Sequence, residues 1–348
     1  MTTKTYSEAL RLAQKECLQD KNCLIMGLGV PDPKGIFGST LNLQKEFGKE
    51  RVFDIPLSEN AVTGMAIGLA IKGFRPIITH QRVDFALTST EQIINQIAKW
   101  NYMFDGAMNL PLLIRMIIGR GWGQGPQHSQ SLYSIFAHVP GLKIIAPATP
   151  SDAKGMIISA YKDNNPVLCF EHRWLYGLKD EVSDYTYSIP IGKANLIREG
   201  KDLTIISSSY MTIEAIKAAK ILNKNNIFPS ILDLRSISPL DKNAILQTVQ
   251  KTGICVVLDH SHISFGLASE ISSIVNENLF GILKKPTLKI CLPDYPTPTS
   301  HALSKNYYPD SSDIAVKIGR FLGREINFLN QNPSAHHDQP DKDFNGPF

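Results

Sequence analysis

The stretch DIPLSENAVTGMAIGLAIKGFRPI, residues 54–77, places a carboxylate where it can do chemistry. Pro56 favours extended backbone, Ser58 can cap the helix that follows, and Glu59 then lies in the first helical turn. The positive end of the helix dipole stabilises a carboxylate at that place. Spacing alone favours an ordinary first-turn glutamate that stabilises its helix, and a catalytic carboxylate is the alternative.

An aromatic residue and a histidine are the next candidates. Phe85 lies in the segment VDFALTS, and His128 follows a glycine-rich stretch, residues 119–125, that we expect to form a mobile loop. An aromatic side chain can pack against a flat heteroaromatic ring, and a histidine can donate or accept a proton near neutral pH. A core aromatic and an ordinary loop histidine are the competing interpretations.

Composition excludes several classes of protein. Because the net charge is only +4 and charged residues make up 20% of the chain, we expect no basic face for nucleic acid. Five scattered cysteines without a C-x-x-C pair predict buried thiols in a reducing cytosol. We see no signal peptide, no mitochondrial targeting segment and no apolar run of the roughly 18 residues that a membrane span needs. We therefore expect a cytoplasmic protein that binds neither membranes nor nucleic acid.

The pattern of apolar runs predicts an α/β protein. Short apolar runs alternate with helical spacing up to about residue 177, and a second alternation begins at residue 202, which is typical of largely parallel sheets. We predict two three-layer domains, the second smaller. Their boundaries are residues 1–180 for the first domain, 181–200 for a linker, 201–325 for the second domain and 326–348 for a polar tail that is disordered unless a partner orders it.

Residues 5–323 resemble the beta subunit of the decarboxylating component of 2-oxoacid dehydrogenases, a thiamine diphosphate enzyme of the transketolase-like superfamily. The resemblance includes the Glu59 segment and ILDLRSISPLD in the second domain, and it is specific only because several motifs occur together. Two further segments carry it: VDFALTSTEQIINQIAKWNYM, and the long run from GQGPQHSQS to YKDNNPV. The resemblance implies a pyrimidine-binding first domain with a mostly parallel sheet and a transketolase-C-like second domain.

The same resemblance implies roles for individual residues. Glu59 matches the glutamate that hydrogen-bonds the aminopyrimidine ring of the cofactor and so activates it. Phe85 and Leu57 match positions that contact the cofactor, and His128 matches the histidine that faces the substrate. In some relatives a potassium ion is held at the loop matching ISAYKDNNPV, and a simple turn explains that sequence equally well. The residues at issue are Leu112, Ala160, Asp163 and Asn165.

One motif of the superfamily is absent from the chain. Nowhere does the sequence contain the Gly-Asp-Gly and following Asn that bind the magnesium diphosphate. The resemblance therefore implies an alpha subunit that carries this motif, an α2β2 assembly, and an active site at the subunit interface. We expect the glycine- and alanine-rich helices near residues 64–70 and 151 to provide close-packing surfaces for it.

Several residues depart from the family pattern. Leu28 stands where most relatives have an acid, and residues 79–82, Thr-His-Gln-Arg, replace an acid and apolar residues. Arg82 would favour an anionic or polyhydroxylated substrate, with surface exposure as the alternative. His260 and His262 also depart from the pattern, which leaves docking to a lipoyl acyltransferase open.

The resemblance and the departures from it leave three candidate functions. The first is oxidative decarboxylation of a small-molecule 2-oxoacid with acyl transfer to a lipoyl group. The second is a two-subunit carboligase, transketolase-like or acetoin-type enzyme, which the change at Leu28 favours. The third is a non-catalytic scaffold subunit, and Glu59, Phe85 and His128 together argue against it.

Overall fold

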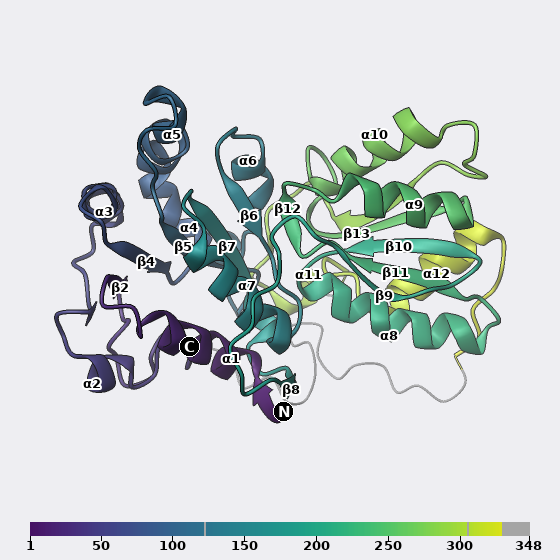
Figure 1. The fold of residues 1–348 in the computed structure, drawn as a ribbon. Coiled ribbons are helices and arrows are strands. Elements are labelled where there is room, and N and C mark those ends of the chain that lie inside the picture. The colour runs from purple at the N-terminus through teal and green to yellow at the C-terminus, as the bar shows by residue number, and fades with distance from the viewer. Residues whose placement is uncertain (122, 305, 329–348) are drawn as a thin grey trace.

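Two α/β units, each with a sheet between layers of helices, make up the chain (Figure 1). The structure is a computed structural model that describes residues 1–121, 123–304 and 306–328. It confirms the predicted fold class of two three-layer domains with mostly parallel sheets. The predicted disordered tail, 326–348, lies outside the described residues from position 329 onward.

The first sheet has seven strands in the order β12-β6-β7-β5-β4-β2-β3, and β12 alone is antiparallel to its neighbour. Its central strands are buried along their whole length, as expected for parallel strands covered on both faces. The strands are β2 (Cys23–Met26), β3 (Val52–Phe53), β4 (Arg75–His80), β5 (Leu113–Ile118), β6 (Lys143–Ile145), β7 (Val167–His172) and β12 (Ser236–Ser238).

Helices cover both faces of this first sheet. Helix α1 packs against α7, and α3 packs against β4 and α4 on the opposite face (Figure 1). The α-helices are α1 (Tyr6–Cys17), α2 (Leu43–Phe47), α3 (Glu59–Ile71), α4 (Val83–Ala86), α5 (Trp100–Met103), α6 (Tyr133–Ala137) and α7 (Pro150–Lys162). Shorter turns are η1 (Leu87–Ser89), the π-helix η2 (Gln92–Ile97), η3 (Pro126–His128) and η4 (Arg173–Leu175).

The second sheet has the order β14-β13-β10-β11-β9, with β9 antiparallel and the others parallel. Helices α8 and α12 pack together on one face, and α9 and α10 pack together on the other. The elements are β9 (Asn195–Arg198), β10 (Leu203–Ser207), α8 (Tyr210–Lys224), β11 (Pro229–Asp233), α9 (Lys242–Thr252), β13 (Cys255–His262), α10 (Leu267–Leu279), β14 (Leu288–Leu292), α11 (His301–Ser304) and α12 (Ser311–Leu322).

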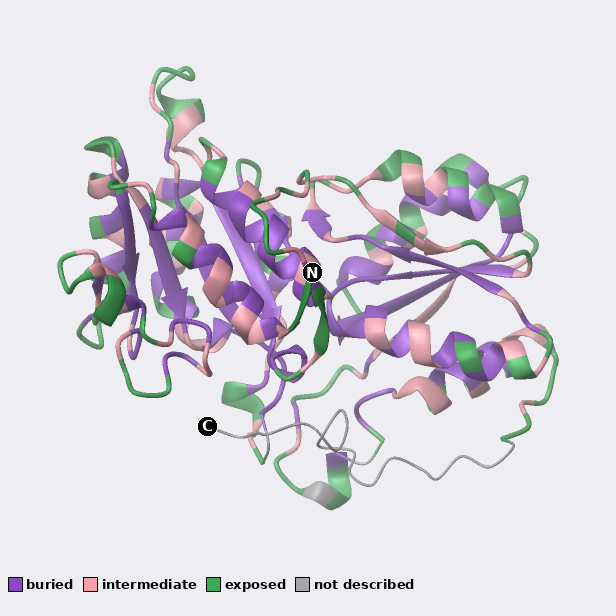
Figure 2. Ribbon diagram, turned by 60° about the horizontal axis from the view of Figure 1, so that its bottom comes forward, coloured by how far each residue is buried: buried purple, intermediate pink, exposed green. Residues whose placement is uncertain are grey.

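The two units are joined by a strand that crosses between them and by a common hydrophobic core. Strand β12 leaves the second unit and pairs with β6 of the first, with Ser236 opposite Ile145. Arg235, just before it, forms an ion pair of 2.6 Å with Asp152 on α7. Both hydrophobic clusters run through both units, and Figure 2 shows the strands of both sheets as buried. The seam between the units is therefore held by main-chain pairing, charge and packing together.

The predicted linker also takes part in the sheets. Strand β9 lies within residues 181–200 and forms an edge of the second sheet, and β8 (Lys179–Val182) pairs with β1 (Thr2–Thr5). The exact domain boundaries stay a prediction.

All five cysteines are free, and all but the half-buried Cys291 are buried, as predicted. Among the described residues, no helix has both the length and the apolarity to cross a membrane.

A buried ion pair ties the centre of the first sheet together. Arg115 on β5 binds Glu171 on β7 through two hydrogen bonds, of 2.6 and 2.8 Å, and both side chains are fully buried. Gln14, Ser39 and Thr79 accept the remaining three guanidinium hydrogens, and the Tyr176 hydroxyl donates to Glu171. Each charge is compensated, which is the condition under which a buried pair is tolerated.

Replacing Glu171 with Gln tests this pair, because it removes the negative charge and leaves Arg115 buried without compensation. We expect the free energy of unfolding to fall by about 3–5 kcal/mol. The measurement is the shift in the urea unfolding midpoint. The control is Glu199→Gln in the exposed pair with Lys251, which should cost less than about 1 kcal/mol. Equal midpoints for the two variants would contradict the assignment.

Candidate active site

Glu59 is the first residue of α3 and is 9% exposed, between the exposed residues Ser58 and Asn60. Its carboxylate has no hydrogen-bond partner among the described residues. The predicted cap by Ser58 was wrong, because Ser58 has φ −153° and ψ 56° and its side chain makes no capping bond. The N–H of Ser58 donates instead to the carbonyl of Pro56, at 2.7 Å. Glu59 thus presents an uncommitted carboxylate at a helix N-terminus.

Phe85 and His128, 43 positions apart in the chain, meet in the structure. Their ring centroids lie 5.4 Å apart at an interplanar angle of 82°, an edge-to-face contact. Phe85, on α4, is half-buried, and His128, at the end of η3, is exposed. Because α3 packs against α4, the helix that begins at Glu59 lies beside the helix that carries Phe85. Leu57 is 77% exposed on the segment that leads into α3.

The loop that carries His128 is tied to the segment that carries Phe85. Arg82 donates to the carbonyl of Gly119, at 2.5 Å, and to the side-chain oxygen of Gln124. At the other end of the loop, Gln130 donates to Asp84, at 2.7 Å. Arg82 and Asp84, which both precede Phe85, therefore hold the two ends of the loop, and this restrains the contact between Phe85 and His128.

These contacts settle where the unusual residues 79–82 lie. Arg82 is 3% exposed, so the surface alternative is excluded, and burial is the main cause that lowers its pKa to about 10. His80 is also buried, and burial lowers its pKa to about 4, so its imidazole is neutral at pH 7. Gln81 donates to the carbonyl of Leu28, at 2.9 Å. The sequence marked Arg82 as unusual, but nothing local identified the loop as its partner.

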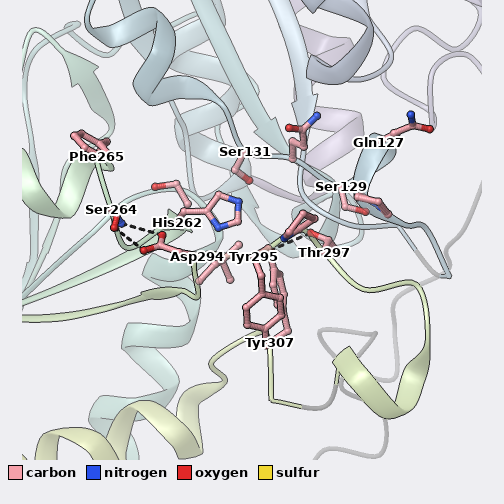
Figure 3. A pocket seen from close by; sticks show the side chains of 15 residues that line it. Gln127, Ser129, Ser131, His262, Ser264, Phe265, Asp294, Tyr295, Thr297 and Tyr307 are labelled. Carbon is pink, nitrogen blue, oxygen red and sulfur yellow. Dashed lines mark hydrogen bonds between the residues drawn. The ribbon is translucent and has the colours of Figure 1, made fainter.

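A pocket of about 540 Å³ lies between the His128 loop and the second unit, and sequence reasoning missed it. Figure 3 shows hydroxyl groups and aromatic rings around it, with Ser129 and Ser131 from the loop facing His262 and Tyr307 from the second unit. Nδ1 of His262 lies 2.7 Å from the carbonyl of Pro293. The residues that line the pocket come from four separate parts of the chain. Of the residues facing it from the second unit, only His262 was noted in the sequence, as a departure from the family pattern.

The four residues proposed for potassium are committed to other contacts. The carbonyl of Leu112 accepts from Val167, and that of Ala160 accepts from Asp163. The Asp163 carboxylate forms an ion pair of 2.5 Å with Lys143 and accepts from the N–H of Asn165. These contacts fit a bend of the chain, and two cations nearby, Lys143 and Arg75, disfavour a third. The potassium ion stays a prediction to which we assign no role.

One face of α3 is open for another subunit. Ala61, Met65 and Gly68 are exposed at spacings of four and three, and nothing lies within 4 Å of the position of a side chain at Gly68. The expectation of a second such surface on α7 was wrong. Helix α7 is covered by α1 and β8 of the same chain, and its Gly155 faces Ile189.

Comparison with protein families gives two matches that together span most of the chain. Residues 2–179 match the model described as "Transketolase, pyrimidine binding domain", and residues 192–314 match "Transketolase, C-terminal domain". Among solved structures, a "Split gene transketolase, inactive beta4 tetramer" superposes with a TM-score of 0.72 at 22% identity, over 92% of this chain and 97% of that one. This likeness supports the fold.

Curated relatives resemble the chain over nearly its whole length. The acetoin:2,6-dichlorophenolindophenol oxidoreductase subunit beta of Cupriavidus necator is 43% identical over 81% of this chain and 83% of its own. The pyruvate dehydrogenase E1 component subunit beta of Bacillus subtilis is 38% identical, over 91% and 96%. The 2-oxoisovalerate dehydrogenase subunit beta of the same organism is 37% identical, over 91% and 98%. The chain therefore belongs to the transketolase-like family of E1 component beta subunits, which includes those of pyruvate, acetoin and 2-oxoisovalerate dehydrogenases.

Proposed function

We propose that this chain is the beta subunit of a heteromeric thiamine diphosphate enzyme that oxidatively decarboxylates a 2-oxoacid and transfers the acyl group to a lipoyl group. The observation that carries the proposal is the uncommitted carboxylate of Glu59 at the start of α3, beside the helix that carries Phe85. Such an arrangement fits the pyrimidine half of the cofactor, which needs one carboxylate and one aromatic face. Bound thiamine diphosphate supplies the carbanion chemistry that cleaves the bond beside the substrate carbonyl.

Each residue of the site then has a distinct task. Glu59 shares a proton with a ring nitrogen of the aminopyrimidine, which its mostly buried, unpaired carboxylate is free to do. Phe85 packs against the flat ring, and Leu57 supplies apolar surface at the mouth. His128 is exposed, and we assign to it the task of holding or moving a proton on the substrate.

The site is completed by a second polypeptide. The chain lacks the Gly-Asp-Gly and Asn motif, so we assign the diphosphate and its Mg²⁺ to an alpha subunit in an α2β2 assembly. The open face of α3 and the exposed apolar side chains near it give such a partner a surface. These side chains are Leu57, Met65 and Ile71, on α3 or the segment before it, and Leu87 on η1, which packs against α3. We place this enzyme in the cytoplasm.

The acyl acceptor distinguishes the main proposal from its alternative. Leu28 replaces the acid of most relatives, and an acetoin-type beta subunit is 43% identical to the chain, which supports an acetoin-type or carboligase reaction. The pyruvate and 2-oxoisovalerate dehydrogenase subunits, similar over 91% of the chain, support a 2-oxoacid as the substrate.

Exchanging Glu59 for Gln in the assembled heteromer tests the catalytic assignment. Gln cannot share its proton with the cofactor, so we expect turnover to fall at least about 100-fold while the subunits still assemble. The measurements are steady-state turnover and, separately, cofactor binding. Glu50→Gln, an identical change at an exposed loop position, should leave turnover unchanged. Unchanged turnover in Glu59→Gln would instead favour a scaffold subunit.

A panel of 2-oxoacids, assayed with and without a lipoylated domain, tests the acceptor. We expect one 2-oxoacid to be consumed faster when the lipoylated domain is present, because the acyl group then has its acceptor. An artificial electron acceptor controls for decarboxylation without acyl transfer. Activity that a lipoylated domain leaves unchanged, but that an aldehyde acceptor increases, would support the carboligase alternative.

A further inference from the structure

Six side chains meet where the carboxyl ends of strands from both sheets approach each other. We call them the seam cluster: His172, Arg173, Trp174, Tyr210, His260 and Tyr308. The rings of His172 and Tyr210 stack at 4.9 Å, and those of His260 and Tyr308 stack at 5.3 Å. All six are buried. Ligands of open α/β sheets bind outside the carboxyl ends of parallel strands, so this is where the fold favours a binding site.

The two histidines form a hydrogen-bonded chain with a defined direction. Burial lowers the pKa of His260 to about 3 and also lowers that of His172, so both rings are neutral at pH 7. The backbone N–H of Trp174 donates to Nδ1 of His172, so Nδ1 is the acceptor and the proton of the neutral His172 ring is on Nε2. That proton is donated to Nδ1 of His260, at 3.1 Å. The proton of His260 is therefore on Nε2.

This chain of bonds ends on a donor without an acceptor. Nε2–H of His260 has no hydrogen-bond partner among the described residues, although His260 is 4% exposed. The indole Nε1–H of Trp174, 6% exposed, is in the same condition, and the two rings lie 5.8 Å apart. A buried donor left unpaired costs about 1–3 kcal/mol. The two donors belong to neighbouring rings, so one ligand with several acceptor oxygens can satisfy both.

Two arginines act electrostatically on the seam cluster. Arg82 donates to neutral oxygens, those of Gly119 and Gln124, and Arg173 lies 4.3 Å over the ring of Phe37. The charge of Arg173 adds to burial in lowering the pKa of Arg82, and both arginines disfavour the protonated form of His172. Asp84 acts in the opposite direction, because its carboxylate raises the pKa of Arg82.

We propose that the seam cluster binds an oxyanion, the carboxylate or phosphate group of a small molecule, through Nε2–H of His260 and Nε1–H of Trp174. Arg82, which donates to neutral oxygens, provides the compensating charge. The cluster residues themselves do not line the pocket of about 540 Å³, but Ser261 and Tyr307, the chain neighbours of His260 and Tyr308, do, so that pocket is the nearest space for the rest of such a molecule. Arg82 also holds the His128 loop, so the bound anion would stabilise the position of that loop. The inference is independent of the proposed thiamine chemistry.

Calorimetric titration of the full-length chain tests the site. Sodium phosphate and sodium acetate are titrated separately, with ionic strength held constant by sodium chloride. We expect saturable binding of at least one anion, and the anion that binds identifies the group as phosphate or carboxylate. Trp174→Phe keeps an aromatic ring but removes one donor, so it should weaken binding roughly tenfold or more. Its melting midpoint is measured to show that the variant is folded.

Trp100→Phe is the matched control, because Trp100 also has a buried indole N–H without a partner but lies away from the cluster, against Phe104. This variant should bind the anion as the unmodified chain does. Absence of saturable binding of either anion, or an equal loss in both variants, would overturn the proposal. A crystal of the anion complex must show the anion within hydrogen-bonding distance of both nitrogens, and a water molecule or a chain segment there would refute it.

Discussion

Parallel strands end at the same edge of a sheet, and in this chain the carboxyl ends from two sheets meet at one seam. Arg82 follows β4, Gly119 follows β5, His172 ends β7 and His260 lies near the end of β13. Hydrogen bonds join these strand ends in two pairs. Arg82 donates to the carbonyl of Gly119, and His172 is bonded to His260. Gly119 has φ +78°, and any side chain there would clash with the His172 ring, so the loop can approach only because this residue is glycine. Every candidate functional contact depends on this convergence.

The convergence requires that the two units do not slide against each other. Strand β12 meets this requirement by pairing with β6 across the seam, and the Arg235–Asp152 ion pair lies beside it. Within the first unit, the buried pair of Arg115 and Glu171 fixes β5 against β7, the strands that end at Gly119 and His172. A polar network in the core therefore also sets the position of the loop that carries His128. This connects the stability of the fold to the geometry of the site.

The sequence predicted features set by local pattern and missed those set by distant contacts. The place of Glu59 follows from the extended segment before α3, and the alternation of apolar runs predicted both sheets. Ser58 failed as a cap because its ψ of 56° is not the extended backbone that capping needs, a value that neighbouring residues do not dictate. Burial of Arg82, the crossing of β12 and the hydroxyl-lined pocket each join segments far apart in the chain, so no spacing rule could find them.

The candidate site residues differ in whether contacts within this chain hold their side chains in place. Phe85 and His128 are fixed by bonds within the chain, through Arg82 at one end of the loop and Asp84 at the other. Glu59, in contrast, has a mostly buried side chain whose carboxylate has no partner among the described residues, so it is available to a group that another molecule brings. Under the proposed function, this chain alone sets the positions of Phe85 and His128. Glu59 would then act only on a cofactor that a second subunit helps to hold.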